Sequence, residues 1–101
     1  MFVAMNRLTA PRELAGRIEQ GFAGSSGNMR ALPGFAGFRL LRARGQSGDE
    51  ALYIAETTWQ DEASFQAWVQ SDAFARAHSG ASGGPLRAAL ELFDQVGGEE
   101  T

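Results

Sequence analysis

The chain of 101 residues contains no cysteine, no lysine and one histidine. Without cysteine there is no disulfide framework, no thiolate nucleophile and no Cys-ligated zinc or iron–sulfur site. Without lysine there is no Schiff-base chemistry, because that chemistry requires a side-chain amine. A single imidazole without a neighbouring carboxylate or second histidine is a poor zinc site. Any histidine-ligated group must therefore be bound by His78.

Long apolar runs and clustered positive charge are also missing. No run approaches the roughly 20 residues that a membrane span requires, so no membrane partner is expected. The first five residues lack the basic segment and cleavage site of a signal peptide, which makes the cytoplasm the expected compartment. The net charge is −3 without a basic cluster, so nucleic acid is not an expected partner.

Short apolar segments alternate with helical stripes along the chain. We expect strands at residues 2–8, 35–44, 51–59 and 86–96, a first helix ending near 22–26, and a second helical region after Trp59. The order strand, helix, strand, strand, helix, strand predicts a ferredoxin-like α+β fold. Its antiparallel sheet would carry both helices on one face. We expect residues 1–96 to form this domain and residues 97–101 a flexible tail.

Alternation along the first strand separates two faces. One face carries Phe2, Ala4, Asn6 and Leu8, and the other carries Val3, Met5 and Arg7. Both faces are largely apolar, so both are expected to be covered. The chain's own helices can cover one. A second copy is the simplest cover for the other, which predicts a homodimer through the sheet faces.

The first helix and second strand give two further local predictions. Thr9 is expected to cap the helix, with Pro11 near its first turn and a stripe of Leu14, Ile18 and Phe22 facing the sheet. In the second strand, alternation places Phe35, Gly37, Arg39 and Leu41 on one face and Ala36, Phe38, Leu40 and Arg42 on the other.

His78 ends a helical pattern beside the glycine-rich residues 79–85 and is expected to share a face with Phe74. A lone histidine on a helix is ordinarily a surface or capping residue. A neutral imidazole in an apolar cleft is nevertheless suited to be a single axial ligand of haem iron, because the porphyrin supplies four nitrogens.

Trp68 and Asn6 are the other two candidates. A tryptophan is usually a core residue, and Trp59, at a strand end, is expected to pack under the following helix. Trp68 differs because it belongs to the same helical region as His78. Asn6 is an amide between Ala4 and Leu8, which is costly unless it is hydrogen-bonded. Either the backbone satisfies it at a bulge or strand end, or its NH₂ donates to a bound ligand.

The chain resembles the antibiotic-biosynthesis-monooxygenase (ABM) superfamily of dimeric, ferredoxin-like α+β barrels. The matching pieces are Asn6, residues 32–38 (LPGFAGF), residues 57–68 (TTWQDEASFQAW) and the segment to His78. Within them, the Pro-Gly-Phe and Thr-Thr-Trp sequences are general to the superfamily. The combination of Asn6, Trp68 and His78 resembles, more narrowly, the IsdG-type haem-degrading monooxygenases. The likeness extends over nearly the whole chain.

This resemblance implies a haem oxygenase in which haem is both cofactor and substrate. His78 would be the proximal iron ligand, Asn6 the distal hydrogen-bond donor, and Trp68 the residue that ruffles the porphyrin. Phe22 and Phe74 would line the pocket. The reaction implied is ring opening with O₂ and electrons from an external reductant, such as a reductase, with release of iron.

One departure and two alternatives accompany this assignment. Some family members place basic residues in the first helix near the haem propionates, whereas residues 20–26 here contain no arginine. Backbone amides or solvent would then meet the propionates. The alternatives are a cofactor-free ABM-type monooxygenase acting on a quinol-like aromatic, and a non-catalytic haem-binding protein.

Overall fold

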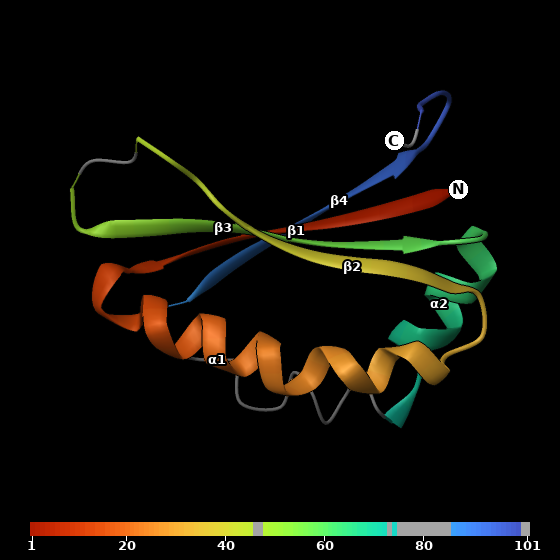
Figure 1. Ribbon diagram of the computed structural model, residues 1–101, viewed down its shortest axis with the longest axis horizontal. Helices are drawn as coiled ribbons and strands as arrows, with labels where there is room; N and C mark the ends of the chain where they lie inside the picture. The colour runs from red at the N-terminus through yellow and green to blue at the C-terminus, as the bar shows by residue number, and fades with distance from the viewer. Residues whose placement is uncertain (46–47, 73, 75–85, 100–101) are drawn as a thin grey trace.

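A four-stranded antiparallel sheet with strand order β2-β3-β1-β4 forms one layer of the molecule (Figure 1). The computed structural model describes residues 1–45, 48–72, 74 and 86–99. The strands are β1 (Phe2–Pro11), β2 (Phe35–Arg42), β3 (Glu50–Trp59) and β4 (Arg87–Asp94). Helices α1 (Ala15–Ser25) and α2 (Glu62–Val69) lie on the same face of the sheet. This confirms the ferredoxin-like α+β prediction.

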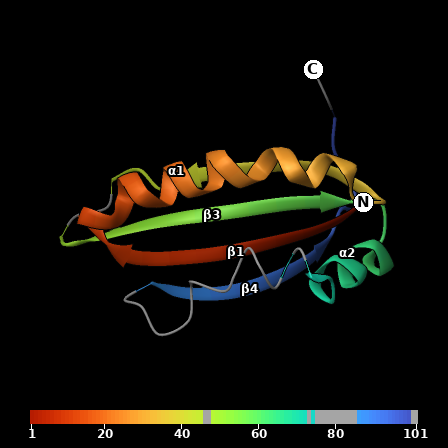
Figure 2. The ribbon, with the colours of Figure 1, turned by 90° about the horizontal axis from the view of Figure 1, so that it is seen from below.

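Each helix covers a different part of the sheet. Helix α1 runs along β2 and β3, whereas α2 lies across the end where β1 begins and β3 finishes (Figure 2). Two core clusters match this division. The cluster between α2 and the sheet consists of Phe65 from the helix and of Phe2, Ala4 and Trp59 from the strands. The cluster under α1 consists of Leu8, Ala51, Tyr53 and Ala55. The predicted inward face of β1 is therefore confirmed.

Strand β1 is longer than predicted, and the cap proposed at Thr9 is wrong. Thr9 pairs with Leu52 of β3 and with Arg87 of β4 inside the sheet. The chain continues in extended form to Pro11, makes a short 3₁₀ turn at Arg12–Leu14, and enters α1 at Ala15. Backbone hydrogen bonds on both edges of the strand outweigh the single bond that a capping hydroxyl offers.

Strand β2 contains a bulge that overturns the predicted facing of Phe35. The pairing runs from Phe35 opposite Trp59 to Gly37 opposite Thr58, which leaves Ala36 as an extra residue. A bulge shifts the alternation by one residue, so Phe35 joins Phe38 and the rest of the helix-facing side. Its ring meets Trp59 edge-on, with the ring centroids 5.5 Å apart.

The start of α2 is fixed against the turn before β2. Asp61 is the N-cap, and its Oδ1 accepts hydrogen bonds from the backbone N–H of Ser64 at 2.8 Å and from the Ser64 hydroxyl at 2.7 Å. Gly34 has a φ of +76° and lies so close to α2 that a Cβ there would be 2.0 Å from Ser64 Oγ. The carbonyl of Gly34 also accepts from the backbone N–H of Gln60 at 2.8 Å.

The remaining predicted elements match the described residues with modest shifts. Helix α1 ends at Ser25 and is followed by a 3₁₀ segment at Ser26–Ala31, as the glycine and serine cluster predicted. Strand β4 is shorter at both ends than residues 86–96. Across the ranges that the structure describes, no helix has the length and apolar character needed to cross a bilayer.

Gly34→Ala should lower the free energy of unfolding by more than about 1 kcal/mol, because alanine is strained at positive φ and its methyl group would displace Ser64. Denaturant unfolding followed by circular dichroism measures this. The matched control is Gly16→Ala in α1, where a Cβ meets nothing within 4 Å and a helix former should stabilise slightly. Equal stability of Gly34→Ala and the unmodified chain would contradict the close docking of α2.

Candidate functional site

Asn6 lies in the middle of β1 on the helix-facing side. It pairs with Ala55 of β3 and Leu90 of β4, and both registers run through it without a bulge. The alternative of an amide satisfied at a bulge or strand end is therefore excluded. Asn6 is half-buried between the buried Ala4 and Leu8. Its side chain hydrogen-bonds to no other residue in the part of the chain that the structure describes.

Trp68 lies on the inner side of α2, half-buried against the cluster beneath that helix. Its indole stacks on Trp59 with ring centroids 5.3 Å apart and an angle of 30° between the rings. The Phe74 ring also contacts the Trp68 indole edge-on, with ring centroids 4.8 Å apart and an angle of 88° between the rings. Ala4, two residues before Asn6 on the same face, belongs to the cluster that Trp68 contacts. Trp68 is thus a half-buried residue of this core cluster, on the same face of the sheet as Asn6.

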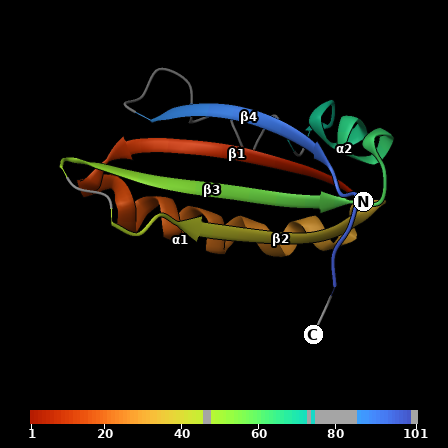
Figure 3. The same cartoon turned by 90° about the horizontal axis from the view of Figure 1, so that it is seen from above.

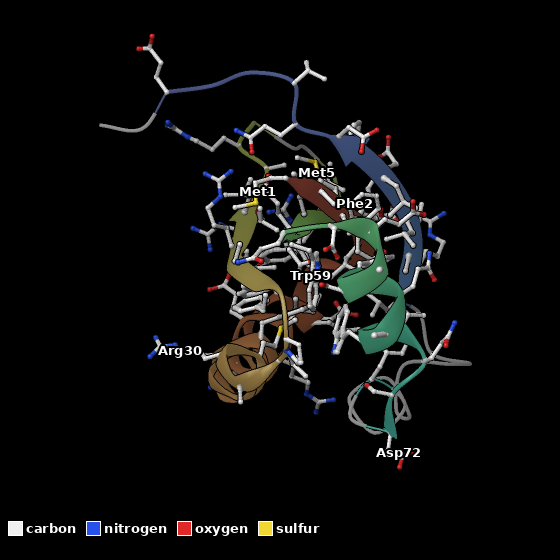
Figure 4. The ribbon with its side chains drawn as sticks, turned by 90° about the vertical axis from the view of Figure 1, so that its right-hand side faces the viewer. Met1, Phe2, Met5, Arg30, Trp59 and Asp72 are labelled. Carbon is white, nitrogen blue, oxygen red and sulfur yellow. The ribbon has the colours of Figure 1, made fainter. Side chains whose placement is uncertain are left out.

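Trp59 is completely buried between the sheet and α2 (Figure 4). Its indole N–H donates a hydrogen bond of 2.9 Å to the hydroxyl of Thr57. Phe35 and Phe65 approach it edge-on at 5.5 Å and 6.1 Å. The prediction that Trp59 is a core residue under the following helix is confirmed.

The other two aromatic candidates have different surroundings. The backbone N–H of Phe74 donates to the Ser71 hydroxyl at 3.2 Å, and that hydroxyl donates to the Trp68 carbonyl at 2.6 Å. This bonding holds Phe74 close to Trp68. Phe22 of α1 is half-buried and stacks on Phe38 at 5.7 Å. Its ring therefore lies against the sheet, and its contact with a ligand stays a prediction.

His78 and the glycine-rich residues after it lie outside the described residues. The structure accordingly brings Asn6, Trp68 and Phe74 to one face of the sheet, and the place of the histidine among them stays a prediction. No group of three or more metal-ligating side chains occurs within the ranges described.

Two leucines of β4 belong beside the candidate residues and were not foreseen. Leu90 lies opposite Asn6, and Leu92 lies opposite Ala4, so both face the helix side. They are 56% and 44% exposed, which is unusual for large apolar side chains on an inner face. The alternation of leucines in β4 was visible in the sequence, but it did not show which strand lies next to β1. The Asn6 amide therefore has exposed apolar side chains beside it on β4, on the same face of the sheet as Trp68.

A separate groove lies on the opposite side of α1, lined by Glu19, Leu40, Arg42, Arg44 and Tyr53. The Tyr53 hydroxyl donates to Glu19 Oε2 at 2.5 Å, and Arg42 donates to the same oxygen at 2.9 Å. The hydrogen bond from Tyr53, followed by the charge of Arg42, lowers the pKa of Glu19. Burial, followed by the hydrogen bond to Glu19, raises the pKa of Tyr53. This network joins α1 to β2 and β3.

The family of the chain follows from comparison with known proteins. Residues 1–80 match the family model described as antibiotic biosynthesis monooxygenase (ABM). The chain belongs to this family. The ABM domain covers β1 to α2 and the segment that follows α2, which includes Asn6, Trp68 and Phe74.

The curated relatives of this ABM protein include haem oxygenases. The chain is 35% identical over 78 residues to the heme oxygenase (staphylobilin-producing) of Staphylococcus haemolyticus, covering 77% of this chain and 73% of that protein. It is 32% identical over 92 residues to the heme oxygenase (mycobilin-producing) of Mycobacterium tuberculosis, covering 91% and 84%. The predicted resemblance to the haem-degrading branch, and the assignment to an oxidoreductase enzyme class, are confirmed.

A solved structure of a haem-degrading protein is also similar to this chain. The heme-degrader MhuD from Mycobacterium tuberculosis, with two hemes bound in its active site, is similar to this chain with a TM-score of 0.75. The identity is 30%, and the match covers 99% of this chain and 100% of that one. The match therefore spans the sheet and both helices.

The Glu19–Tyr53 pair should make stability depend on pH at both ends of the range. Because the folded pKa of Glu19 lies below its ordinary value near 4.5, its contribution is present above that pH and is lost in more acidic solution. Because the folded pKa of Tyr53 lies above its ordinary value of 10.0, its contribution is present below that pH and is lost in more alkaline solution.

Urea unfolding midpoints measured from below the ordinary pKa of glutamate, 4.5, to above that of tyrosine, 10.0, test whether Glu19 and Tyr53 cause this pH dependence. Glu19→Gln should flatten the acidic side of the profile, and Tyr53→Phe should flatten the alkaline side as well as reduce the acidic dependence. An alkaline loss of stability that persists in Tyr53→Phe would show that another group is responsible.

Proposed function

We propose that this protein is a haem-degrading monooxygenase that binds haem as its substrate and opens the porphyrin ring with O₂ and external electrons, releasing iron. The observation that carries the proposal is the Asn6 amide, which has no hydrogen-bond partner in the described part of the chain and lies next to exposed apolar side chains. Curated relatives named haem oxygenases and the haem-bound relative MhuD support it.

The residues around Asn6 fit a porphyrin. A haem is a broad, flat and largely apolar ring, and it would cover the apolar side chains of Leu90 and Leu92. The half-buried indole of Trp68 lies on the same face, held between Trp59 and Phe74. One amide in such surroundings provides a directed donor without adding a charge to the apolar surface.

Each residue has a distinct part in the proposal. His78 is the axial ligand of the haem iron, in keeping with its being the only imidazole in the chain. Asn6 would supply its NH₂ as a hydrogen-bond donor that stabilises the negative charge developing during reduction. Trp68 presses on the ring and distorts it, while Phe22 and Phe74 pack against its edge. When bound, haem supplies the iron at which dioxygen is reduced and the carbon that is oxidised.

The electrons must come from a separate donor. The reaction consumes electrons, and the sequence contains no G-x-G-x-x-G motif for a dinucleotide. We therefore include an electron-donating reductase, or a chemical reductant in its place, in the proposed reaction.

The open face of the sheet supports a homodimer as part of the proposal. This face, turned away from both helices in Figure 3, carries the half-buried Met5 and Ile54 and the exposed Leu41 and Phe93. Its buried carboxylate, Glu56, is bonded by Arg39 Nε at 2.6 Å. A second copy packed on this face would bury apolar surface without leaving that carboxylate unpaired.

Hemin titration is the decisive test of the haem assignment. The purified protein should develop a Soret band that saturates with bound hemin, and His78→Ala should lose most of it. Ascorbate in air should then bleach the band, and a ferrous chelator should detect released iron. Trp68→Phe should still bind hemin but bleach it several-fold more slowly, because its smaller ring distorts the porphyrin less.

The alternatives give different results in the same assay. A cofactor-free monooxygenase would show no saturable Soret band, and a non-catalytic haem-binding protein would show a band that ascorbate does not bleach. An unchanged bleaching rate in Trp68→Phe would remove Trp68 from the proposed mechanism.

Substitution on the open face tests the dimer. Ile54→Arg should convert a dimer into a monomer, because an unpaired charge would be buried at the interface. Light scattering coupled to size-exclusion chromatography gives the mass. Gln66→Arg, on the exposed side of α2, adds the same charge elsewhere and should leave the dimer intact. A monomer in the unmodified protein would contradict the proposed sheet-to-sheet packing.

A further inference from the structure

The hydrogen bond between Trp59 and Thr57 is buried in an otherwise apolar cluster. Trp59 has no exposed surface, Thr57 is 7% exposed, and the N–H to hydroxyl distance is 2.9 Å. The two residues are two apart on β3, so their side chains leave the same face of the sheet. A rotation of the indole out of its plane about the Cβ–Cγ bond would move its N–H away from the hydroxyl and leave a buried donor unpaired. The bond therefore selects one orientation of the ring.

Trp68 stacks directly on Trp59, so the orientation of the Trp59 ring constrains that of the Trp68 ring. Phe35 and Phe65 each meet the Trp59 ring in an edge-to-face arrangement, and the Trp68 indole stacks on Trp59 with ring centroids 5.3 Å apart and an angle of 30° between the rings. The Phe74 ring contacts the Trp68 indole edge-on, with ring centroids 4.8 Å apart. The Trp68 ring thus contacts Trp59, Phe74 and, at 6.2 Å, Phe65. Trp59 stacks on Trp68, and its own side chain is hydrogen-bonded to Thr57 of β3.

We propose that Thr57 and Trp59 are positioning residues that set the plane of the Trp68 indole, through the Thr57–Trp59 hydrogen bond and the Trp59–Trp68 stack. The consequence for chemistry rests on the proposed function: the angle at which Trp68 meets the porphyrin decides how the ring is distorted and which of its carbons is oxidised. Thr57 then influences the product of the reaction without touching the substrate.

The stack can be measured without haem. The chain contains two tryptophans, so an exciton couplet in far-ultraviolet circular dichroism can arise from the Trp59–Trp68 pair alone. Trp68→Phe must abolish the couplet. Thr57→Val keeps the shape of the side chain but removes the acceptor, and it should reduce the couplet at least twofold. Thr57→Ser keeps the hydroxyl and should restore it.

Thr58→Val is the matched control. Thr58 is the next residue on β3 and faces the other side of the sheet, where it pairs with Val3 and Gly37. The same chemical change there should leave the couplet unchanged. A full couplet in Thr57→Val would overturn the proposal, as would an equal reduction in Thr58→Val.

The second measurement is made on the haem-loaded protein. At equal Soret occupancy, Thr57→Val should change the ratio of ring-cleavage isomers at least twofold, and Thr57→Ser should keep the original ratio. Trp59→Phe has no N–H to satisfy, so it avoids the unpaired donor that could prevent Thr57→Val from folding. It should shift the ratio in the same direction as Thr57→Val.

The two measurements separate the positioning proposal from the proposed function. If the couplet responds as expected but neither the unmodified protein nor any variant binds hemin, the proposed function fails while the positioning of Trp68 stands. If hemin is degraded and the isomer ratio is the same in Thr57→Val, Trp59→Phe and the unmodified protein, the effect on the product is disproved.

Discussion

Strand β1 is hydrogen-bonded on both of its edges, to β3 along its whole length and to β4 along most of it. This double pairing fixes the register of the central strand, and a slip by one residue would turn every side chain to the other face. The inner face would then lose Phe2 and Leu8, and Asn6 would leave the helix side. Both core clusters and the candidate site depend on this one register.

Patterns within single elements predicted much of this arrangement. Alternation placed Asn6 correctly, because a strand paired on both sides keeps its period of two residues. The second helical region was expected after Trp59, and α2 begins there because the Asp61 carboxylate caps the backbone three residues away. Trp59 was correctly assigned to the core from its place at the end of a strand rich in β-formers.

Interactions between distant segments account for what the sequence did not disclose. Thr9 has the chemistry of a cap, but residues about 43 and 78 positions further along the chain pair with it instead. Phe35 changes face because of one extra residue opposite β3, which local alternation cannot show. Leu90 joined the candidate site only when the strand order placed β4 beside β1.

The close approach of Gly34 to Ser64 has a mechanical consequence for α2. The helix is held at its first turn by this contact and by the Asp61 cap, which together fix where its N-terminal end lies against the sheet. Trp68 lies four residues beyond Ser64, which is about one turn and about 6 Å along the axis at about 1.5 Å per residue. A change of a few degrees in the angle of α2 at its first turn would move the indole by several tenths of an ångström. The position of the Trp68 indole therefore depends on how the turn before β2 holds the first turn of α2.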